Sequence, residues 1–286
     1  MTSPDISPVS PGPAAETSRA GRNLLAAIAS GLVLLAVVGG SLYLWKPAFM
    51  LVVMAAILIG VWEFKQGFAA KQIRLPFEPL LVGAVVMLVS AYFGGPPALV
   101  TALAVTALAT MLWRLRGGVD GFVRDTTAAV FVAVYVPFLA GFSLLLLRAE
   151  DGPLRVLTFI LVTIASDIGG YAVGALVGRH QMAPVISPKK SWEGFAGSTL
   201  FCIAAGWATV VYFLDGDWWV GVLLGVVTVV MATLGDLCES VIKRDLGIKD
   251  MSSVIPGHGG LMDRLDSLLG TVAPTWLLLF YFVPIS

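Results

Sequence analysis

Long runs of hydrophobic residues, separated by short polar segments, fill most of this sequence. A helix needs about 20 mostly apolar residues to cross the roughly 30 Å hydrocarbon core of a bilayer. The pattern therefore predicts an all-α, polytopic membrane protein, a bundle of about nine transmembrane helices. The candidate spans are Leu24–Leu44, Pro47–Trp62, Phe77–Phe93, Pro96–Trp113, Thr127–Leu147, Leu154–Gly178, Phe195–Leu214, Trp218–Glu239 and Leu268–Val283.

The composition supports a membrane protein and excludes a soluble enzyme. Hydrophobic residues make up 58% of the chain and charged residues only 13%, against about 25% charged residues in soluble domains. The spans must be helical, because lipid cannot satisfy open backbone groups and the alternating pattern of a membrane barrel does not occur. Basic and acidic residues number 18 each, so no net charge attracts nucleic acid, and we expect no nucleic-acid partner.

Basic residues predict the orientation of the chain, because cytoplasmic loops are enriched in lysine and arginine. If the amino terminus is cytoplasmic and the carboxyl terminus lies outside, every lysine and arginine except Lys46, Arg148 and Arg155 faces the cytoplasm. We interpret residues 1–22 as a disordered cytoplasmic tail and 23–150 as a scaffold of five spans. Residues 151–286 form the catalytic region, with four spans and two charged cytoplasmic loops, Arg179–Gly194 and Ser240–Ser267. The short loops favour a bacterial plasma (inner) membrane.

A carboxylate lies inside the sixth predicted span. Asp167 and Tyr171 are four residues apart and share one helix face, and an acid at membrane depth is a functional candidate by default. A structural ion pair is the alternative interpretation of Asp167. Gly170, Gly174 and Gly178 recur every fourth residue, which favours close packing against a neighbouring helix.

The segment Pro184–Gly194, before the seventh span, carries two adjacent lysines. Lys189 and Lys190 supply point charges suited to phosphate oxygens, and Ser187 adds a hydroxyl. The competing interpretation is a basic anchor on the cytoplasmic side of the membrane. Two prolines, Pro184 and Pro188, indicate a shaped loop.

The strongest candidate site combines acids and bases around the eighth span and the loop that follows. On a helix, Asp236, Glu239 and Lys243 share one face, and Asp263 and Asp266 can also point the same way. Such carboxylates suit Mg²⁺, which prefers oxygen ligands and keeps waters for substrate phosphates. The basic residues Lys243, Arg244, Lys249 and Arg264 would neutralise phosphate charge, and the turn containing His258 could approach a phosphate closely. A solvated loop and a structural salt-bridge network are the alternatives.

These residues carry a family resemblance. The run Ser240-x-x-Lys243-Arg244, Lys249-Asp250, Pro256-x-His258-Gly259-Gly260 and Asp263-Arg264-x-Asp266 resembles the signature of phosphatidate cytidylyltransferases, also called CDP-diacylglycerol synthases. The segment Ile186–Gly194 is similar to that family's lysine loop. At Asp167–Tyr171 the chain has Asp-Ile-Gly-Gly-Tyr where the family usually has Asp-Thr-Gly-Ala-Tyr, which puts a hydroxyl role there in doubt. The resemblance covers the second half of the chain.

The resemblance implies a Mg²⁺-dependent reaction of CTP with phosphatidic acid at the cytoplasmic face of the membrane, giving CDP-diacylglycerol and pyrophosphate. It implies catalytic roles for Asp236, Lys243, Asp263, Arg264 and Asp266, with Asp236, Asp263 and Asp266 as the metal ligands. The expected substrate-binding residues are Ser187, Lys189, Lys190, Arg244, Lys249, His258, Asp167 and Tyr171. The residues do not decide whether a second, monovalent ion such as K⁺ is bound. A homodimer fits a protein of this kind, although no interface is visible in the sequence.

Two other functions stay open at this point. A CTP-dependent lipid kinase of the polyprenol or phytol type would share the nucleotide and metal chemistry, but should lack the full signature. An ion-coupled transporter would account for Asp167 and for the glycine-interrupted spans. The charged clusters are not duplicated between the two halves of the chain, which counts against transport.

Overall fold

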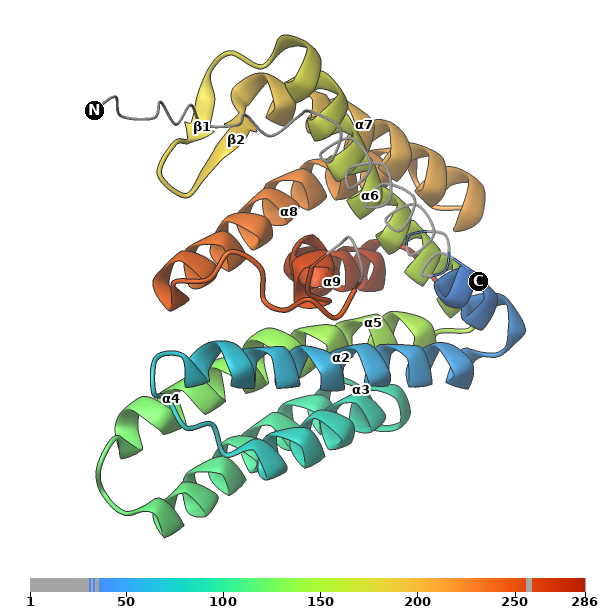
Figure 1. Ribbon diagram of the computed structural model, residues 1–286. Coiled ribbons are helices and arrows are strands. Elements are labelled where there is room, and N and C mark those ends of the chain that lie inside the picture. Colours follow the sequence, from blue (N-terminus) through green and yellow to red (C-terminus); the bar gives the residue numbers. More distant parts are fainter. Residues whose placement is uncertain (1–30, 32, 34–35, 256–258, 286) are drawn as a thin grey trace, which may run out of the picture.

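The computed structural model describes residues 31, 33, 36–255 and 259–285, which form a helical bundle with one small β-hairpin (Figure 1). In the first half the helices are α2 (Lys46–Ala69), α3 (Phe77–Arg114), α4 (Phe122–Ala133) and α5 (Leu139–Arg148), with the short turns η1 (Leu115–Gly117) and η2 (Val134–Phe138). In the second half the helices are α6 (Gly152–Val177), α7 (Trp192–Phe213), α8 (Trp218–Leu246) and α9 (Met262–Phe282). The strands β1 (Gln181–Ala183) and β2 (Ser187–Ser191) lie between α6 and α7.

Seven helices in the described part of the chain are long and apolar enough to cross a membrane. This confirms a polytopic helical membrane protein, but not the count of nine. Of the first predicted span, Leu24–Leu44, the structure describes residues 31, 33 and 36–44, which are helical. The third and fourth predicted spans both fall within α3, and the fifth corresponds to α4, η2 and α5 in continuous succession.

The chain reverses direction inside α3. Gly95 has a φ of +76°, a conformation that side chains disfavour, and Pro96 follows where a new helical arm begins. A Cβ placed on Gly83 would lie 2.2 Å from the side chain of Thr106, so the two arms are in contact on either side of Gly95. The element α3 is therefore a tight antiparallel hairpin of two apolar arms.

The two charged loops differ from the prediction. The segment Ser240–Ser267 is not one loop, because α8 continues to Leu246 and ends at Gly247, whose φ of +75° provides a left-handed cap. The helix α9 then begins at Met262. The segment Arg179–Gly194 contains an antiparallel β-hairpin, so the fold is not purely α-helical. Ser191 ends the hairpin and caps α7 by accepting a hydrogen bond from the amide of Gly194.

Small residues bring the helices of the second half into close contact. A Cβ on Gly170 would lie 2.6 Å from the hydroxyl of Ser198, and one on Gly178 would lie 2.7 Å from that of Ser191, so α6 and α7 cross closely. This confirms the packing role that the spacing of these glycines predicts. In the same way, a Cβ on Gly235 would lie 2.8 Å from the carbonyl oxygen of Asp266, where α8 crosses α9.

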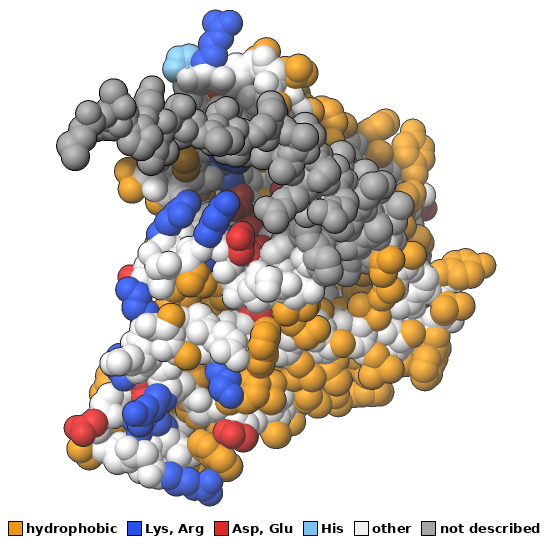
Figure 2. Space-filling view, in the orientation of Figure 1, with side chains coloured by type: hydrophobic (Ala, Val, Ile, Leu, Met, Phe, Trp, Pro, Cys, Tyr) orange, Lys and Arg blue, Asp and Glu red, His pale blue; other side chains and the backbone are white. Residues whose placement is uncertain are grey.

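Lysine and arginine side chains gather at one end of the bundle, on the left in Figure 2, and hydrophobic side chains cover the opposite part of this face. The β-hairpin and the carboxyl end of α8 belong to the basic end (Figure 1). At the far end, Lys46 donates hydrogen bonds to the carbonyl oxygens of Ala149 and Glu150. The bundle is therefore polarised in the way that the charge pattern of the sequence predicts.

Candidate active site

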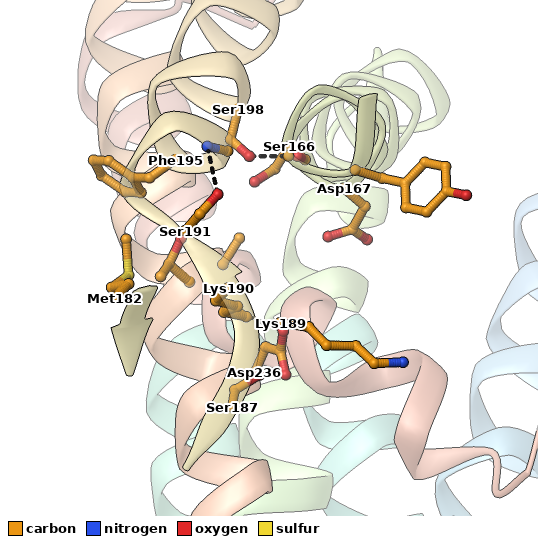
Figure 3. Close-up of a pocket in the computed structure, with 15 residues that line it drawn as sticks. Ser166, Asp167, Met182, Ser187, Lys189, Lys190, Ser191, Phe195, Ser198 and Asp236 are labelled. Atoms are coloured by element: carbon orange, nitrogen blue, oxygen red, sulfur yellow. Dashed lines mark hydrogen bonds and ion pairs between the residues drawn. The ribbon is translucent and has the colours of Figure 1, made fainter. Parts of the chain in front are cut away.

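A cavity of about 330 Å³ opens between α6, the β-hairpin, α7 and α8 (Figure 3). It contains residues from the three charged clusters of the sequence. The predicted site residues that line it are Asp167, Tyr171, Ser187, Lys189, Lys190 and Asp236. Residues about 70 positions apart in the chain, such as Asp167 and Asp236, thus line one cavity.

The hairpin carries the two lysines to the cavity. Both lysines line it, Lys189 with an exposed side chain and Lys190 with a half-buried one. The ammonium of Lys190 lies 2.5 Å from a carboxylate oxygen of Asp236 on α8. Ser240, one turn further along α8, donates a 3.4 Å hydrogen bond to the other oxygen of Asp236. A basic strand and an acidic helix therefore meet at this point.

Asp167 faces the cavity from α6 (Figure 3). Its main electrostatic neighbours are Asp266, Asp236 and Lys190, so it belongs to the same charged cluster. Nearby, Ser198 of α7 donates a 2.6 Å hydrogen bond to the carbonyl oxygen of Ser166, which fixes α6 against α7. Tyr171 borders the same cavity, but its side chain is 81% exposed.

A second ion pair joins α8 to the start of α9. The ammonium of Lys243 lies 2.7 Å from one carboxylate oxygen of Asp263 and 3.4 Å from Glu239. The other oxygen of Asp263 accepts hydrogen bonds from the amides of Met251, at 3.0 Å, and Gly260, at 2.8 Å. Asp263 thus organises the loop between the two helices in addition to contacting Lys243.

Two more acids belong to the same region, Glu239, which also faces Lys243, and Asp266. Glu239 is fully buried, and neither of its carboxylate oxygens has a hydrogen-bond partner in the described part of the chain. It interacts electrostatically with Asp266 and Asp263, while Asp266 interacts with Asp236. The close crossing of α8 and α9 at Gly235 is what brings these acids together. The result is a cluster of carboxyl groups beside Lys190 and Lys243.

Three other described site residues lie outside the cavity. Arg244 and Lys249 are exposed, and neither lines the cavity. Arg264 is exposed on the first turn of α9. His258 lies outside the described residues. The cavity is therefore lined by Asp167, Asp236 and the two hairpin lysines. Lys243, Asp263 and Asp266 belong to the neighbouring charged cluster and do not line the cavity themselves.

The structure adds a residue that the sequence analysis did not single out. Glu63 on α2 is fully buried and accepts hydrogen bonds from Ser252, Leu261 and Met262, in the loop that leads into α9. Its position could have marked it as a candidate, since Glu63 directly follows the second predicted span and ionisable groups are rare at such positions. Its partners could not be inferred, since they are 189 or more positions away along the chain.

The carboxylates do not form a ready-made metal cage. Across the described residues, no group of three or more histidine, cysteine, aspartate or glutamate side chains is arranged to hold a metal ion. The chemistry of the cluster nevertheless suits a hard cation, because Glu239 is buried beside Asp263 and Asp266, and the cation that faces it is the ammonium of Lys243, 3.4 Å away. Mg²⁺ commonly binds through one or two carboxylates together with substrate phosphates, so a complete protein cage is not required.

Comparison with known proteins places the chain in a family. The sequence model of the cytidylyltransferase family matches residues 25–282, which is most of the chain. The chain belongs to the cytidylyltransferase family. Among curated members of this family, it is similar to the phosphatidate cytidylyltransferase of Mycobacterium tuberculosis (strain H37Rv), with 40% identity over 93% of this chain and 85% of the relative.

Other cytidylyltransferases show the same relationship. The phosphatidate cytidylyltransferase of Mycobacterium leprae is 40% identical over 92% of this chain and 89% of the relative. That of Haemophilus influenzae is 30% identical over 89% of this chain and 97% of the relative. The similarity thus extends well beyond the signature residues, into the first half of the chain.

Proposed function

We propose that this protein transfers CMP from CTP to phosphatidic acid, giving CDP-diacylglycerol and pyrophosphate, a step of phospholipid biosynthesis. Its family membership and its similarity to phosphatidate cytidylyltransferases over most of their length support this function. The observation that carries the proposal is the shared cavity. Lys189 and Lys190 meet Asp167 and Asp236 there, at the basic end of a bundle of membrane-length helices.

The location of the cavity suits two very different reactants. CTP is a water-soluble anion, whereas phosphatidic acid keeps its acyl chains in the lipid and its phosphate at the surface. A cavity with two lysines and two aspartates beside apolar helices can receive both phosphates at that boundary, together with a cation. Phosphoryl and nucleotidyl transfers depend mainly on positioning and on charge stabilisation, which is what such a cavity supplies.

The reaction needs little covalent chemistry from the protein. A phosphate oxygen of phosphatidic acid attacks the α-phosphorus of CTP, and the bond from this phosphorus to the bridging oxygen of pyrophosphate breaks. The phosphate is already anionic, so no strong base has to remove a proton. Lys189, Lys190 and Lys243 would offset the negative charge of the reacting phosphates, and Arg244, Lys249 and His258 stay proposed contacts. Arg264 would stabilise the departing pyrophosphate.

The acids would hold the Mg²⁺ that this chemistry uses to neutralise phosphate charge. Asp236, Asp263 and Asp266 are the proposed ligands, and a second, monovalent ion such as K⁺ stays compatible with the cluster. The hydrogen bonds of Asp263 leave room for such a contact at one oxygen. The oxygen that accepts from Met251 and Gly260 uses both lone pairs, whereas the oxygen that faces Lys243 keeps a second one. Lys190 and Lys243, paired with aspartates here, would then be able to turn towards substrate phosphates.

We further propose the setting of the enzyme. The basic end, and with it the cavity, faces the cytoplasm of a bacterial plasma membrane, and the chain crosses the membrane about nine times. The carboxyl terminus then lies outside. Because lysine and arginine are enriched on the cytoplasmic side of membrane proteins, the charge asymmetry of the bundle supports this orientation. Assembly into a homodimer is also proposed, on the basis of the resemblance.

The position of the label in the product tests the proposed reaction. Purified protein in detergent is supplied with Mg²⁺, dioleoyl phosphatidate and CTP labelled at either the α- or the γ-phosphate. We expect the α-label to enter the lipid and the γ-label to leave as pyrophosphate. Lipid labelled from the γ-position would instead indicate a CTP-dependent lipid kinase, and absence of either transfer would contradict both functions.

A further inference from the structure

The buried carboxylate of Glu63 holds the loop that leads into α9. One carboxylate oxygen accepts hydrogen bonds from the hydroxyl of Ser252, at 2.5 Å, and from the amide of Leu261, at 2.8 Å. The other accepts a 2.8 Å hydrogen bond from the amide of Met262. The two amides belong to the start of α9, where a carboxylate is favoured by the free N–H groups and by the helix dipole.

The face of α2 around Glu63 is shaped to receive the same segment. Gly60 and Gly67 lie one turn on either side of Glu63. A Cβ on Gly60 would lie 2.7 Å from the sulfur of Met262, and one on Gly67 would lie 3.2 Å from Leu246. Two glycines and one acid of α2 thus contact the end of α8 and the beginning of α9.

The residues held in this way carry the second ion pair of the site. Met262 is followed directly by Asp263, which contacts Lys243 and accepts hydrogen bonds from Met251 and Gly260. The two carboxylates therefore hold the same loop, and they approach each other at Gly260. A Cβ on Gly260 would lie 2.8 Å from an oxygen of Asp263 and 3.0 Å from an oxygen of Glu63.

We propose that Glu63 is a positioning residue of the active site, which sets the place of Asp263 and Lys243 by fixing the loop before α9. This inference rests on the proposed function, because it assigns the held pair to the binding of CTP and its Mg²⁺. It gives the first half of the chain, through α2, a direct part in substrate binding. A carboxylate that only stabilised the fold would affect folding and leave the affinity of the folded protein unchanged.

The test compares Glu63→Gln with the wild-type protein in detergent. Glutamine keeps one acceptor oxygen but turns an NH₂ group towards a backbone N–H, so at least one hydrogen bond to the loop is lost. We expect the dissociation constant for CTP, measured with Mg²⁺ by equilibrium dialysis without phosphatidate, to rise about tenfold or more, as when outer partners of metal ligands are removed. The KM for CTP should rise in parallel, and the KM for phosphatidate should stay unchanged.

Ser252→Ala provides a second variant that leaves the buried acid intact. It removes one hydrogen bond of Glu63, so the dissociation constant for CTP should rise about fivefold, in line with the net contribution of one hydrogen bond. In the Glu63→Gln background it should add less than it does alone, because the two groups act on one contact. Glu78→Gln, an exposed acid on α3 at the same end of the bundle, should leave CTP binding unchanged.

The proposal is overturned if the thermal midpoint of Glu63→Gln falls while its affinity for CTP stays at the wild-type value. An equal rise of both KM values would also overturn it, since a general disturbance would then account for the loss. Failure of the proposed function looks different. In that case the wild-type protein itself binds no CTP and transfers no label, and the inference falls with the function on which it rests.

Discussion

The ion pair between Lys190 and Asp236 allows stability and activity to be separated at a single residue. Both side chains are partly exposed, and such pairs contribute about 1 kcal/mol or less to folding. Asp236→Asn should therefore change the free energy of unfolding by less than about 1 kcal/mol. Its rate of CMP transfer should nevertheless fall about 100-fold or more, as when an electrostatic contact to the reacting group is removed. Steady-state assays and thermal denaturation of the same preparation measure both effects.

A matched control for Asp236→Asn lies on the same helix. Asp217 precedes the first turn of α8 and is exposed, and its side chain caps no backbone amide. Asp217→Asn should therefore keep wild-type activity. If Asp236→Asn retained more than about a tenth of the activity, the residue would lose its proposed role, because a catalytic electrostatic contact is worth far more than that.

The crossing of α8 and α9 makes the arrangement of the acids depend on one glycine. In Gly235→Ala the added Cβ would lie 2.8 Å from the backbone oxygen of Asp266, so a helix has to move. We expect a loss of about 1–3 kcal/mol in stability, as for overpacked sites. Activity should fall by up to about 100-fold, because a displacement of about 1 Å can cost that much. Gly39→Ala, whose added Cβ would meet no described residue within 4 Å, should leave both unchanged. A fully active Gly235→Ala would contradict this role of the crossing.

At the scale of elements, the sequence predicts what depends on local periodicity. The glycines of α6 at every fourth position are in close contact with α7, and the acid–base spacing of α8 places Glu239 and Lys243 within 3.4 Å on one face. The actual end of α8 was missed, because hydropathy falls at Glu239 while the helix continues on polar residues to the cap at Gly247. The β-hairpin was missed because its strands are too short to show an alternating pattern.

At the scale of the whole molecule, the sequence does not reveal contacts between the two halves of the chain. The three charged clusters of the second half do meet at one site, as their chemistry suggests. However, α2 contributes Glu63 to the loop before α9, and no local pattern can reveal a contact between positions 63 and 262. The reversal at Gly95 illustrates the same limit, because only the contact of Gly83 with Thr106 shows that the two arms of α3 lie side by side.

The polarity of the bundle leads to a prediction about the entire chain. The amino end of α6 meets the carboxyl end of α9, because Arg155 donates hydrogen bonds to the carbonyl oxygens of Leu279, Val283 and Pro284. The other end of α6 leads into the β-hairpin with its lysines. The chain therefore leaves α9 at the end of the bundle opposite the cavity (Figure 1).

A pair of reporters fused to the chain in bacterial cells would measure this orientation. With the basic end in the cytoplasm, alkaline phosphatase fused after Ser286 should be active, since this reporter works only outside the cytoplasm. The same reporter inserted at Gly118, in the turn between η1 and α4 at the basic end, should be inactive there, and a fluorescent protein should give the opposite pair of signals. An active phosphatase at Gly118 would place the cavity outside the cell. CTP could not reach it there, and the proposed reaction would be excluded together with the orientation.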